Sequence, residues 1–417
     1  MSASAGEAAL NRLRSLAEPL EHRDFRYLWA AQVFSELGDW SGRLALALVV
    51  AERTHSAAIT ALVTSLSVLP YIGLGQMLST LANRFPRRRT ILLTDLGRAA
   101  LFALMALELP VPMLLVLAFA AGVCTPPFEA ARNSLTPLSV PRETYGAAIA
   151  LASLTFEMSV LFGYASGGGL VALLGARAAL LANSMSFLVS AALLVRIPAA
   201  NEPNAPEGRR VTISDGWHAL MDEPYVRRFL ASFTIVGACA VVIESLVTVY
   251  GLTELNLSSG EIGLLAASMP AGAIVAVTLG RSSGADNVKM RRAAQMALAG
   301  AAVGFFVFGA GSAMPLVLLG FGAAGCLNAS RVPANEVAVL RIEDAVRIPA
   351  FSIIDGFLAG SQALSAAVGG VIAREIGLRP TFAGAMAIAA IAGAWGVIDP
   401  PRRRPRHMVR FSEQQSR

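Results

Sequence analysis

Long apolar stretches alternate along this chain with short charged or Pro- and Gly-containing breaks. Several stretches, such as residues 101–122, 226–251 and 293–318, reach the roughly 20 residues with which an α-helix crosses a hydrocarbon core of about 30 Å. Each such stretch predicts a membrane-spanning helix. The predicted spans are 27–51, 57–82, 90–109, 111–131, 145–174, 176–197, 226–251, 260–281, 293–313, 314–336, 347–373 and 378–398.

The stretch between the sixth and seventh spans has a different composition. Residues 198–225 are polar, charged and rich in proline, which indicates a linker with one short surface helix from Ile213 to Met221. The predicted fold class is an all-α membrane protein of twelve transmembrane helices in two pseudo-symmetric six-helix bundles. The expected segments are 1–26 before the first span, bundles at 27–197 and 226–398, the linker at 198–225 and a basic tail at 399–417.

A repeated pattern supports the division into two similar halves. Gly168-Gly169 in the fifth span precedes a Gly-x-Arg turn at Gly175, and Gly369-Gly370 in the eleventh span precedes a similar turn at Gly377. The two copies are offset by 201 to 202 residues. A duplicated unit with an even number of spans restores the starting side, as in transporters built from parallel repeats.

Basic residues mark every second connection between the spans. Under the positive-inside rule this alternation predicts that both termini are cytoplasmic, and we expect a multi-pass protein of the plasma membrane. The basic residues on the predicted cytoplasmic side are Arg84, Arg87, Arg88, Arg89, Arg132, Arg142, Arg196, Arg209, Arg210, Arg281, Lys289, Arg291, Arg292, Arg341, Arg347, Arg402, Arg403, Arg404, Arg406 and Arg410.

Composition then excludes several classes of function. Only 15% of the residues are charged against 55% hydrophobic, and the net charge of +6 comes from short blocks between apolar runs, not from one amphipathic face that would suit nucleic acid. The three cysteines lie far apart, which predicts no metal site. The single lysine, Lys289, is followed by Met290, so no phosphate-binding loop for ATP exists. We expect no enzyme activity, no cofactor and no obligate protein partner.

Ionisable side chains inside the first span are the strongest candidates for a functional site, because a buried charge is costly unless it is paired or faces water. Glu36, Asp39 and Arg43 lie at i, i+3 and i+7 and share one helical face. Two interpretations fit this spacing. Asp39 and Arg43 neutralise each other inside the bundle, or Glu36 binds a proton or the substrate.

Three further carboxylates stand alone in apolar runs: Glu157, Glu244 and Asp355. Each either lines the transport pathway or packs against a partner on another helix, and the sequence leaves both interpretations open.

Small residues in the fifth span form a second candidate feature. Gly163 and Gly167 have the GxxxG spacing of closely packed helices, and Gly168-Gly169 continue it. Ordinary tight packing and a hinge are both compatible with this spacing.

The sequence resembles the major facilitator superfamily, and more narrowly its drug, macrolide and siderophore exporter branch. The resemblance rests on Phe25-Arg26-Tyr27-Leu28-Trp29, on Ser35-Glu36-Leu37-Gly38-Asp39-Trp40 and on the basic loop after the second span. In that loop Arg84, Arg87 and Arg88 match the family pattern, whereas Ser79, Asn83 and Pro86 replace its glycines and acid. In the family's antiporter signature of the fifth span, Gly163-Tyr164 replaces Gly-Pro.

The resemblance implies that this loop latches the cytoplasmic ends of the helices. Because Asn83 cannot supply the family's acid, we hypothesise that Asp95, with Arg98 one turn later, partners the loop arginines instead. The resemblance also implies a secondary exporter of drug-like or secondary-metabolite molecules, with a coupling proton that we assign to Glu36. A facilitator or importer of an amphiphilic metabolite or lipid, and a non-transporting membrane receptor or scaffold, are the alternatives.

Overall fold

The computed structural model describes residues 17–71, 86–141, 143–197, 213–222, 224–280, 286–310, 313–329 and 344–397. Within these ranges the regular secondary structure is helical. The longer helices are α2 (Arg23–Thr54), α3 (Ala57–Val68), α5 (Arg87–Met105), α6 (Val111–Ser139), α7 (Tyr145–Leu194), α9 (Pro224–Thr253), α10 (Ser259–Gly280), α11 (Asp286–Ala310), α12 (Met314–Ala329), α14 (Asp344–Ile376) and α15 (Leu378–Val397). The predicted all-α fold is therefore confirmed.

The helix ends follow local sequence signals. His55 adopts a left-handed conformation (φ 49°) that ends α2, and the hydroxyl of Ser56 accepts a hydrogen bond from the Ile59 amide to begin α3. Pro110 and Pro112 begin α6, where a proline costs no helical hydrogen bond. The predicted surface helix of the linker is present as α8 (Ile213–Asp222).

Two glycine turns separate pairs of spans within the halves. Gly175 (φ 81°) interrupts α7, which consists of two helices in the positions of the fifth and sixth predicted spans. Gly377 (φ 90°) separates α14 from α15 in the same way. Both conformations favour glycine because a Cβ would be strained there. The two positions are 202 residues apart, as the repeat predicts.

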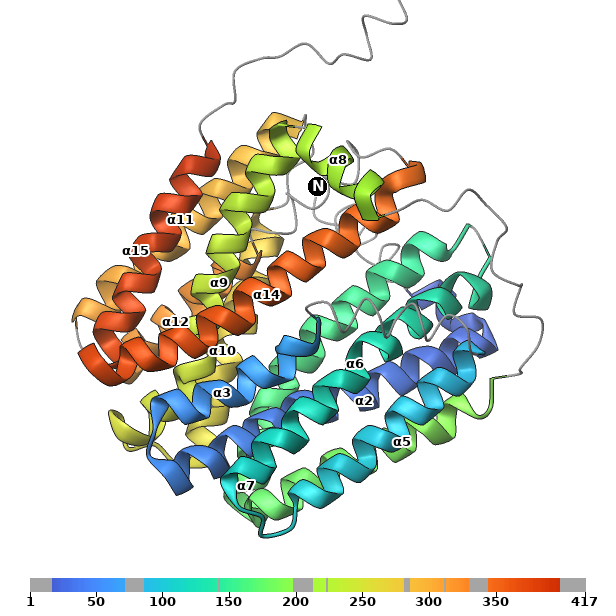
Figure 1. Cartoon of the computed structure of the whole chain (residues 1–417), viewed down its shortest axis with the longest axis horizontal. Helices are drawn as coiled ribbons and strands as arrows, with labels where there is room; N and C mark the ends of the chain where they lie inside the picture. Colours follow the sequence, from blue (N-terminus) through green and yellow to red (C-terminus); the bar gives the residue numbers. More distant parts are fainter. Residues whose placement is uncertain are drawn as a thin grey trace, which may run out of the picture.

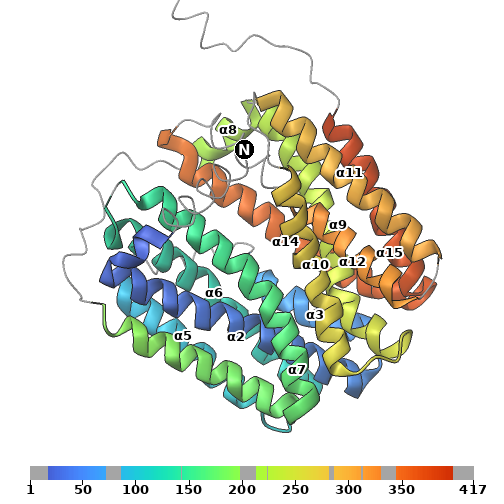
Figure 2. The same ribbon diagram turned by 180° about the vertical axis from the view of Figure 1, so that it is seen from behind.

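Two bundles lie side by side (Figure 1), α2 to α7 in one and α9 to α15 in the other, and Figure 2 shows the same division from behind. They meet where α7 packs on α10 and where α3 packs on α14. We call the side that carries α8 the linker side, and the side that carries the turns at His55, Gly175 and Gly377 the loop side. Helix α8 packs on α14, where Trp217 stacks on Phe357 with ring centroids 6.0 Å apart.

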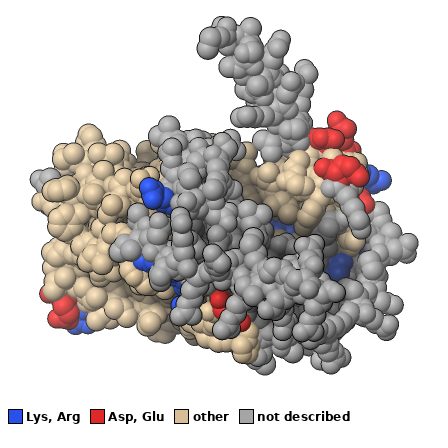
Figure 3. Space-filling view, turned by 90° about the horizontal axis from the view of Figure 1, so that it is seen from above, with Lys and Arg blue, Asp and Glu red and all other residues tan. Residues whose placement is uncertain are grey.

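Apolar side chains cover the outside of the molecule as well as its core. In Figure 3 most described atoms belong to neither acidic nor basic residues. Within the described ranges, six helices are long and apolar enough to span a membrane: Val111–Asn133, Tyr145–Leu194, Ala231–Thr253, Ser259–Ala276, Gly356–Ile376 and Leu378–Trp395. Shorter apolar helices occupy Ala57–Val68, Ala294–Gly309 and Met314–Ala329. An apolar exterior is what a bilayer-embedded helical protein requires.

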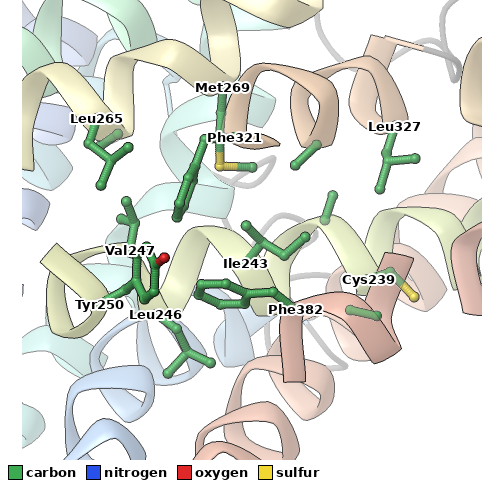
Figure 4. Packing of buried hydrophobic residues seen from close by; sticks show 14 of the residues in the cluster. Cys239, Ile243, Leu246, Val247, Tyr250, Leu265, Met269, Phe321, Leu327 and Phe382 are labelled. Atoms are coloured by element: carbon green, nitrogen blue, oxygen red, sulfur yellow. The ribbon is translucent and has the colours of Figure 1, made fainter. Parts of the chain in front are cut away.

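The largest core cluster extends across both bundles. Its centre in the C-terminal bundle is aromatic: Tyr250, Phe321 and Phe382 are fully buried and point toward one another (Figure 4), with ring centroids 5.3 to 6.0 Å apart. Leu44 and Tyr164 from the N-terminal bundle belong to the same cluster. Continuous packing of this kind stabilises the observed relative position of the bundles, because its loss would expose apolar surface to water or a cavity.

Candidate functional site

A cavity lies between the two bundles and is lined by helices from both. Its polar lining includes Arg43 and Glu157 from the N-terminal bundle and Glu244, Asn328 and Gln362 from the C-terminal bundle. The predicted candidates Arg43, Glu157 and Glu244, which are distant in sequence, are thus brought to one space. A cavity between two similar bundles, with a few polar groups in an apolar wall, has the general form of a small-molecule binding site.

Aromatic rings form one wall of the cavity. Trp40 packs edge-to-face against Tyr164 and Phe156, with centroid distances of 5.3 and 6.1 Å. The guanidinium of Arg43 lies 5.1 Å from the Trp40 ring, within the range of a cation–π contact. These rings offer a flat apolar surface beside a positive charge and two carboxylates.

The hydroxyl of Tyr164 donates a hydrogen bond of 2.6 Å to Oε1 of Glu244. Tyr164 is 8% exposed and comes from α7, whereas Glu244 comes from α9, so this bond joins the two bundles. From the sequence, Tyr164 stands out only because it replaces the proline of the family's Gly-Pro step. A tyrosine directly after a packed glycine, seven residues beyond Glu157 on the same helical face, was the available signal.

The charged residues on one face of α2 form two separate ion pairs, one within α2 and one with α6. Arg43 forms a 2.8 Å ion pair with Asp39, which matches the first of the two interpretations for that pair. Glu36 turns to α6 instead, where its Oε1 accepts hydrogen bonds from Arg132 at 2.5 Å and from Gln32 at 2.9 Å. Its other oxygen, Oε2, is buried and has no hydrogen-bond partner among the described residues.

A second buried pair lies deeper in the N-terminal bundle. Asp95 is fully buried and accepts hydrogen bonds from Arg98 at 2.5 Å and from the Ser190 hydroxyl at 2.6 Å. The guanidinium of Arg98 lies 4.1 and 4.4 Å from the rings of Phe128 and Phe187. The arginine therefore neutralises Asp95 and fills the space between two aromatic side chains.

Replacing Arg98 by methionine is expected to destabilise the protein strongly. Removing one member of a buried ion pair leaves the other charge uncompensated, at a cost of about 3–5 kcal/mol. A thermal unfolding assay on the detergent-solubilised protein measures the loss. The matched control is Arg379→Met, which breaks the 3.0 Å pair with Glu254, where the arginine side chain is 35% exposed and the expected effect is about 0–1 kcal/mol. Equal shifts in melting temperature for the two variants would contradict this account of the Asp95 pair.

The predicted latch falls partly outside the described residues. Asn83 and Arg84 lie there, and of the other loop residues Arg88 donates a hydrogen bond to the carbonyl of Val195 while Arg87 begins α5. Among the described residues, the hydrogen-bond donors to Asp95 are Arg98 and Ser190. The latch itself stays a prediction. Asp355 lies in α14, but its side chain is also outside the described residues.

The glycines of α7 face two different neighbours. A Cβ added at Gly163 would lie 2.6 Å from the Trp40 Cβ, and one at Gly167 would lie 2.8 Å from the Ser41 Cα, so both glycines let α7 pack on α2. Gly168 faces the other bundle, where its Cβ would meet the Gly263 Cα at 2.6 Å. Gly169 has open space around it.

The same arrangement recurs in α14. Gly369 packs within its own bundle, where a Cβ would lie 2.8 Å from Cγ1 of Val242. Gly370 crosses to the N-terminal bundle, where a Cβ would lie 2.9 Å from the Ala58 Cα. The structural equivalents are therefore Gly167 with Gly369 and Gly168 with Gly370, an offset of 202 residues. We call the two crossing contacts, Gly168 with Gly263 and Gly370 with Ala58, the loop-side seal.

No group of three or more His, Cys, Asp or Glu side chains is placed to hold a metal ion in the ranges that the structure describes. The groups that a ligand can contact in the cavity are two carboxylates, one guanidinium, amides and aromatic rings. They come from α2, α7, α9, α12 and α14.

Two solved transporter structures have a similar fold. The chain aligns with a bacterial homologue of the human lysosomal transporter Spinster, in an inward-facing and unoccupied conformation, with a TM-score of 0.71 and 14% identity over 90% of this chain and 96% of that one. A bacterial homologue of the iron transporter ferroportin, also inward-facing, aligns with a TM-score of 0.69 and 13% identity over 90% and 98% of the two chains.

Sequence relatives agree with this fold. The MFS-type transporter YfiS of Bacillus subtilis (strain 168) is 27% identical over 216 residues, which are 50% of this chain and 52% of YfiS. Macrolide efflux protein A of Streptococcus pyogenes is 30% identical over 124 residues, 28% and 31% of the two chains. The matched regions thus span about half, or less, of these relatives. The family model of the Major Facilitator Superfamily matches residues 28–333, and this chain therefore belongs to that superfamily of transporters.

Proposed function

We propose that this protein is a secondary active exporter that moves drug-like or secondary-metabolite small molecules across the plasma membrane by alternating access. The observation that carries the proposal is the cavity between the bundles, lined from both sides and closed toward the loop side by the glycine contacts. In this mechanism the bundles, at about residues 27–197 and 226–398, rock around a central site.

The linker side is the cytoplasmic side in this proposal, because the described arginines Arg88, Arg132 and Arg196 lie at or near the ends of α5, α6 and α7 that face it. We propose that the cavity opens toward the cytoplasm, by analogy with the inward-facing structures to which the fold is similar. Both termini are placed in the cytoplasm by the same assignment.

The cavity lining supports an amphiphilic substrate, and a sequence relative supports export. The cavity wall combines the rings of Trp40 and Phe156 with charged groups, which suits a ligand with an apolar body and polar substituents. A relative that matches part of the chain is a macrolide efflux protein. A growth assay tests the proposal: cells that overproduce the protein are expected to tolerate more erythromycin, or another compound of a toxic panel, than cells that lack it.

Coupling to the proton gradient is assigned to Glu36. Its carboxylate is held by Arg132 through one oxygen, while Oε2 is buried without a partner among the described residues. A half-satisfied buried carboxylate is a place where a proton can bind and release the guanidinium. The latch residues Asn83, Arg84, Arg87, Arg88, Asp95 and Arg98 are proposed to stabilise the linker ends of the helices during this cycle.

Glu36→Gln is expected to remove the dependence of transport on a pH gradient. The amide mimics the protonated acid, so the variant loses gradient-driven accumulation but keeps downhill exchange. Proteoliposome flux of radiolabelled erythromycin, or of another substrate from the growth assay, is measured with and without an imposed pH gradient.

The matched control for this experiment is Glu261→Gln, at an exposed side chain at the start of α10. Normal coupling in Glu36→Gln, or a wild type that ignores the gradient, would contradict the assignment and favour a facilitator. A wild type without flux of any compound would favour a receptor or scaffold.

A further inference from the structure

The hydrogen bond between Tyr164 and Glu244 joins the two bundles, unlike four ion pairs that the described part of the chain contains. Glu36 with Arg132, Asp39 with Arg43, and Asp95 with Arg98 each join residues of the N-terminal bundle, and Glu254 with Arg379 joins residues of the C-terminal bundle. Tyr164 and Glu244 belong to different bundles. Their bond therefore stretches or breaks when one bundle rotates against the other.

The backbone of Tyr164 lies next to the loop-side seal. A Cβ added at Gly263 would lie 2.7 Å from the carbonyl oxygen of Tyr164 and 2.8 Å from the Gly168 Cα, so the tyrosine backbone is itself part of the contact between α7 and α10. Its side chain extends from there to the cavity wall. Opening the loop side separates α7 from α10 and carries the hydroxyl of Tyr164 away from Glu244.

The packing around Tyr164 holds its hydroxyl in position. The ring is 8% exposed, lies edge-to-face on Trp40 and belongs to the core cluster that spans both bundles. Because the ring is already fixed by packing, it loses little conformational freedom when its hydroxyl forms the hydrogen bond. More of the free energy of this bond is then available to stabilise the conformation in which the bond forms.

We propose that the hydrogen bond from Tyr164 to Glu244 is a tie between the two bundles that stabilises the conformation sealed on the loop side, and that it breaks each time this side opens. The inference rests on the proposed alternating-access cycle. It makes Tyr164 a positioning residue of that cycle, which acts through Glu244 and the relative placement of the bundles.

The tie is tested by labelling a cysteine in the cavity from each side of the membrane. Thr64→Cys places the thiol in the cavity lining, in a chain whose native cysteines are replaced (C124A, C239A and C326A). A membrane-impermeant maleimide is applied to right-side-out and to inverted vesicles, and Glu108→Cys, at an exposed residue of a loop-side turn, identifies the loop side. The ratio of the two initial labelling rates follows the equilibrium between the two open conformations and needs no substrate.

Tyr164→Phe is expected to raise the ratio of loop-side to linker-side labelling by about tenfold, which corresponds to about 1.4 kcal/mol and to the loss of one hydrogen bond to a charged group. Glu244→Met is expected to act in the same direction, and the double variant no more than the stronger single variant. Tyr250→Phe is the matched control, since it removes a buried tyrosine hydroxyl inside the C-terminal bundle and is expected to leave the ratio unchanged.

A ratio in Tyr164→Phe within about twofold of the parent, or effects of the two single variants that add in the double variant, would overturn the tie. The same holds if Tyr250→Phe shifts the ratio as much as Tyr164→Phe. Failure of the proposed function has a different signature. A parent protein whose cavity thiol is labelled from one side only, under all conditions, does not alternate, and both proposals are then wrong.

Discussion

A disulfide between positions 172 and 260 is expected to stop transport, and reduction of the disulfide is expected to restore it. A Cβ built at Gly260, at the start of α10, lies 3.6 Å from the Ala172 Cβ in α7, which is within the range that disulfides span. The bond would hold α7 and α10 together on the loop side. A carrier locked in one conformation exchanges no substrate between the two sides.

The experiment uses Ala172→Cys with Gly260→Cys in the chain that lacks native cysteines. Flux is compared before oxidation, after oxidation and after reduction, and a protease site inserted at residues 198–212 shows on a non-reducing gel whether the halves are joined. Each single variant, treated with the same oxidant, is the control. Full cross-linking with undiminished flux would show that the loop side does not open during transport.

Gly168→Ala is expected to open the loop side, whereas Gly169→Ala is expected to have little effect. The added methyl at position 168 would lie 2.6 Å from both the Gly263 Cα and the Ser259 carbonyl oxygen, and neither backbone atom can rotate away. Position 169 has no atom within 4 Å of a built Cβ. Overpacking a close contact costs about 1–3 kcal/mol, which shifts a two-state equilibrium by about 5- to 150-fold.

Labelling of the cavity thiol introduced by Thr64→Cys measures this shift, and substrate flux measures its consequence. The loop-side rate is expected to rise in Gly168→Ala while transport falls toward the background of empty vesicles, and neither is expected to change in Gly169→Ala. Because the two substitutions differ by one position in the same helix, helix propensity affects both alike. Equal behaviour of the two variants would contradict the assignment of Gly168 to the seal.

Local sequence patterns were sufficient to predict where helices form along the chain and where they break. Apolar length predicted the spans, and the paired Gly-x-Arg turns predicted the breaks that appear at Gly175 and Gly377 with positive φ. The i, i+4 spacing of Asp39 and Arg43 was sufficient for their ion pair, because residues at this spacing lie on one face of a helix.

Helical spacing could not predict ion-pair or hydrogen-bond partners that lie on different helices. Glu36 shares a face with Asp39, yet its cation is Arg132, which is 96 residues away along the chain. Asp95 likewise accepts a hydrogen bond from Ser190, which is 95 residues away along the chain. Periodicity gives the direction of a side chain from its helix axis and carries no information on which neighbouring helix it meets.

By itself, the sequence determined the helical class, the order of the spans, the two-fold repeat and the acids inside apolar runs. These properties depend on hydrophobic length and helical periodicity, which are local. The tertiary structure alone decided that Gly168 faces α10 while Gly167 faces α2, that Glu157 and Glu244 share one cavity, and that Tyr164 bonds across it. These depend on how the helices rotate and pack against one another, which is a property of the whole bundle and not of any one segment.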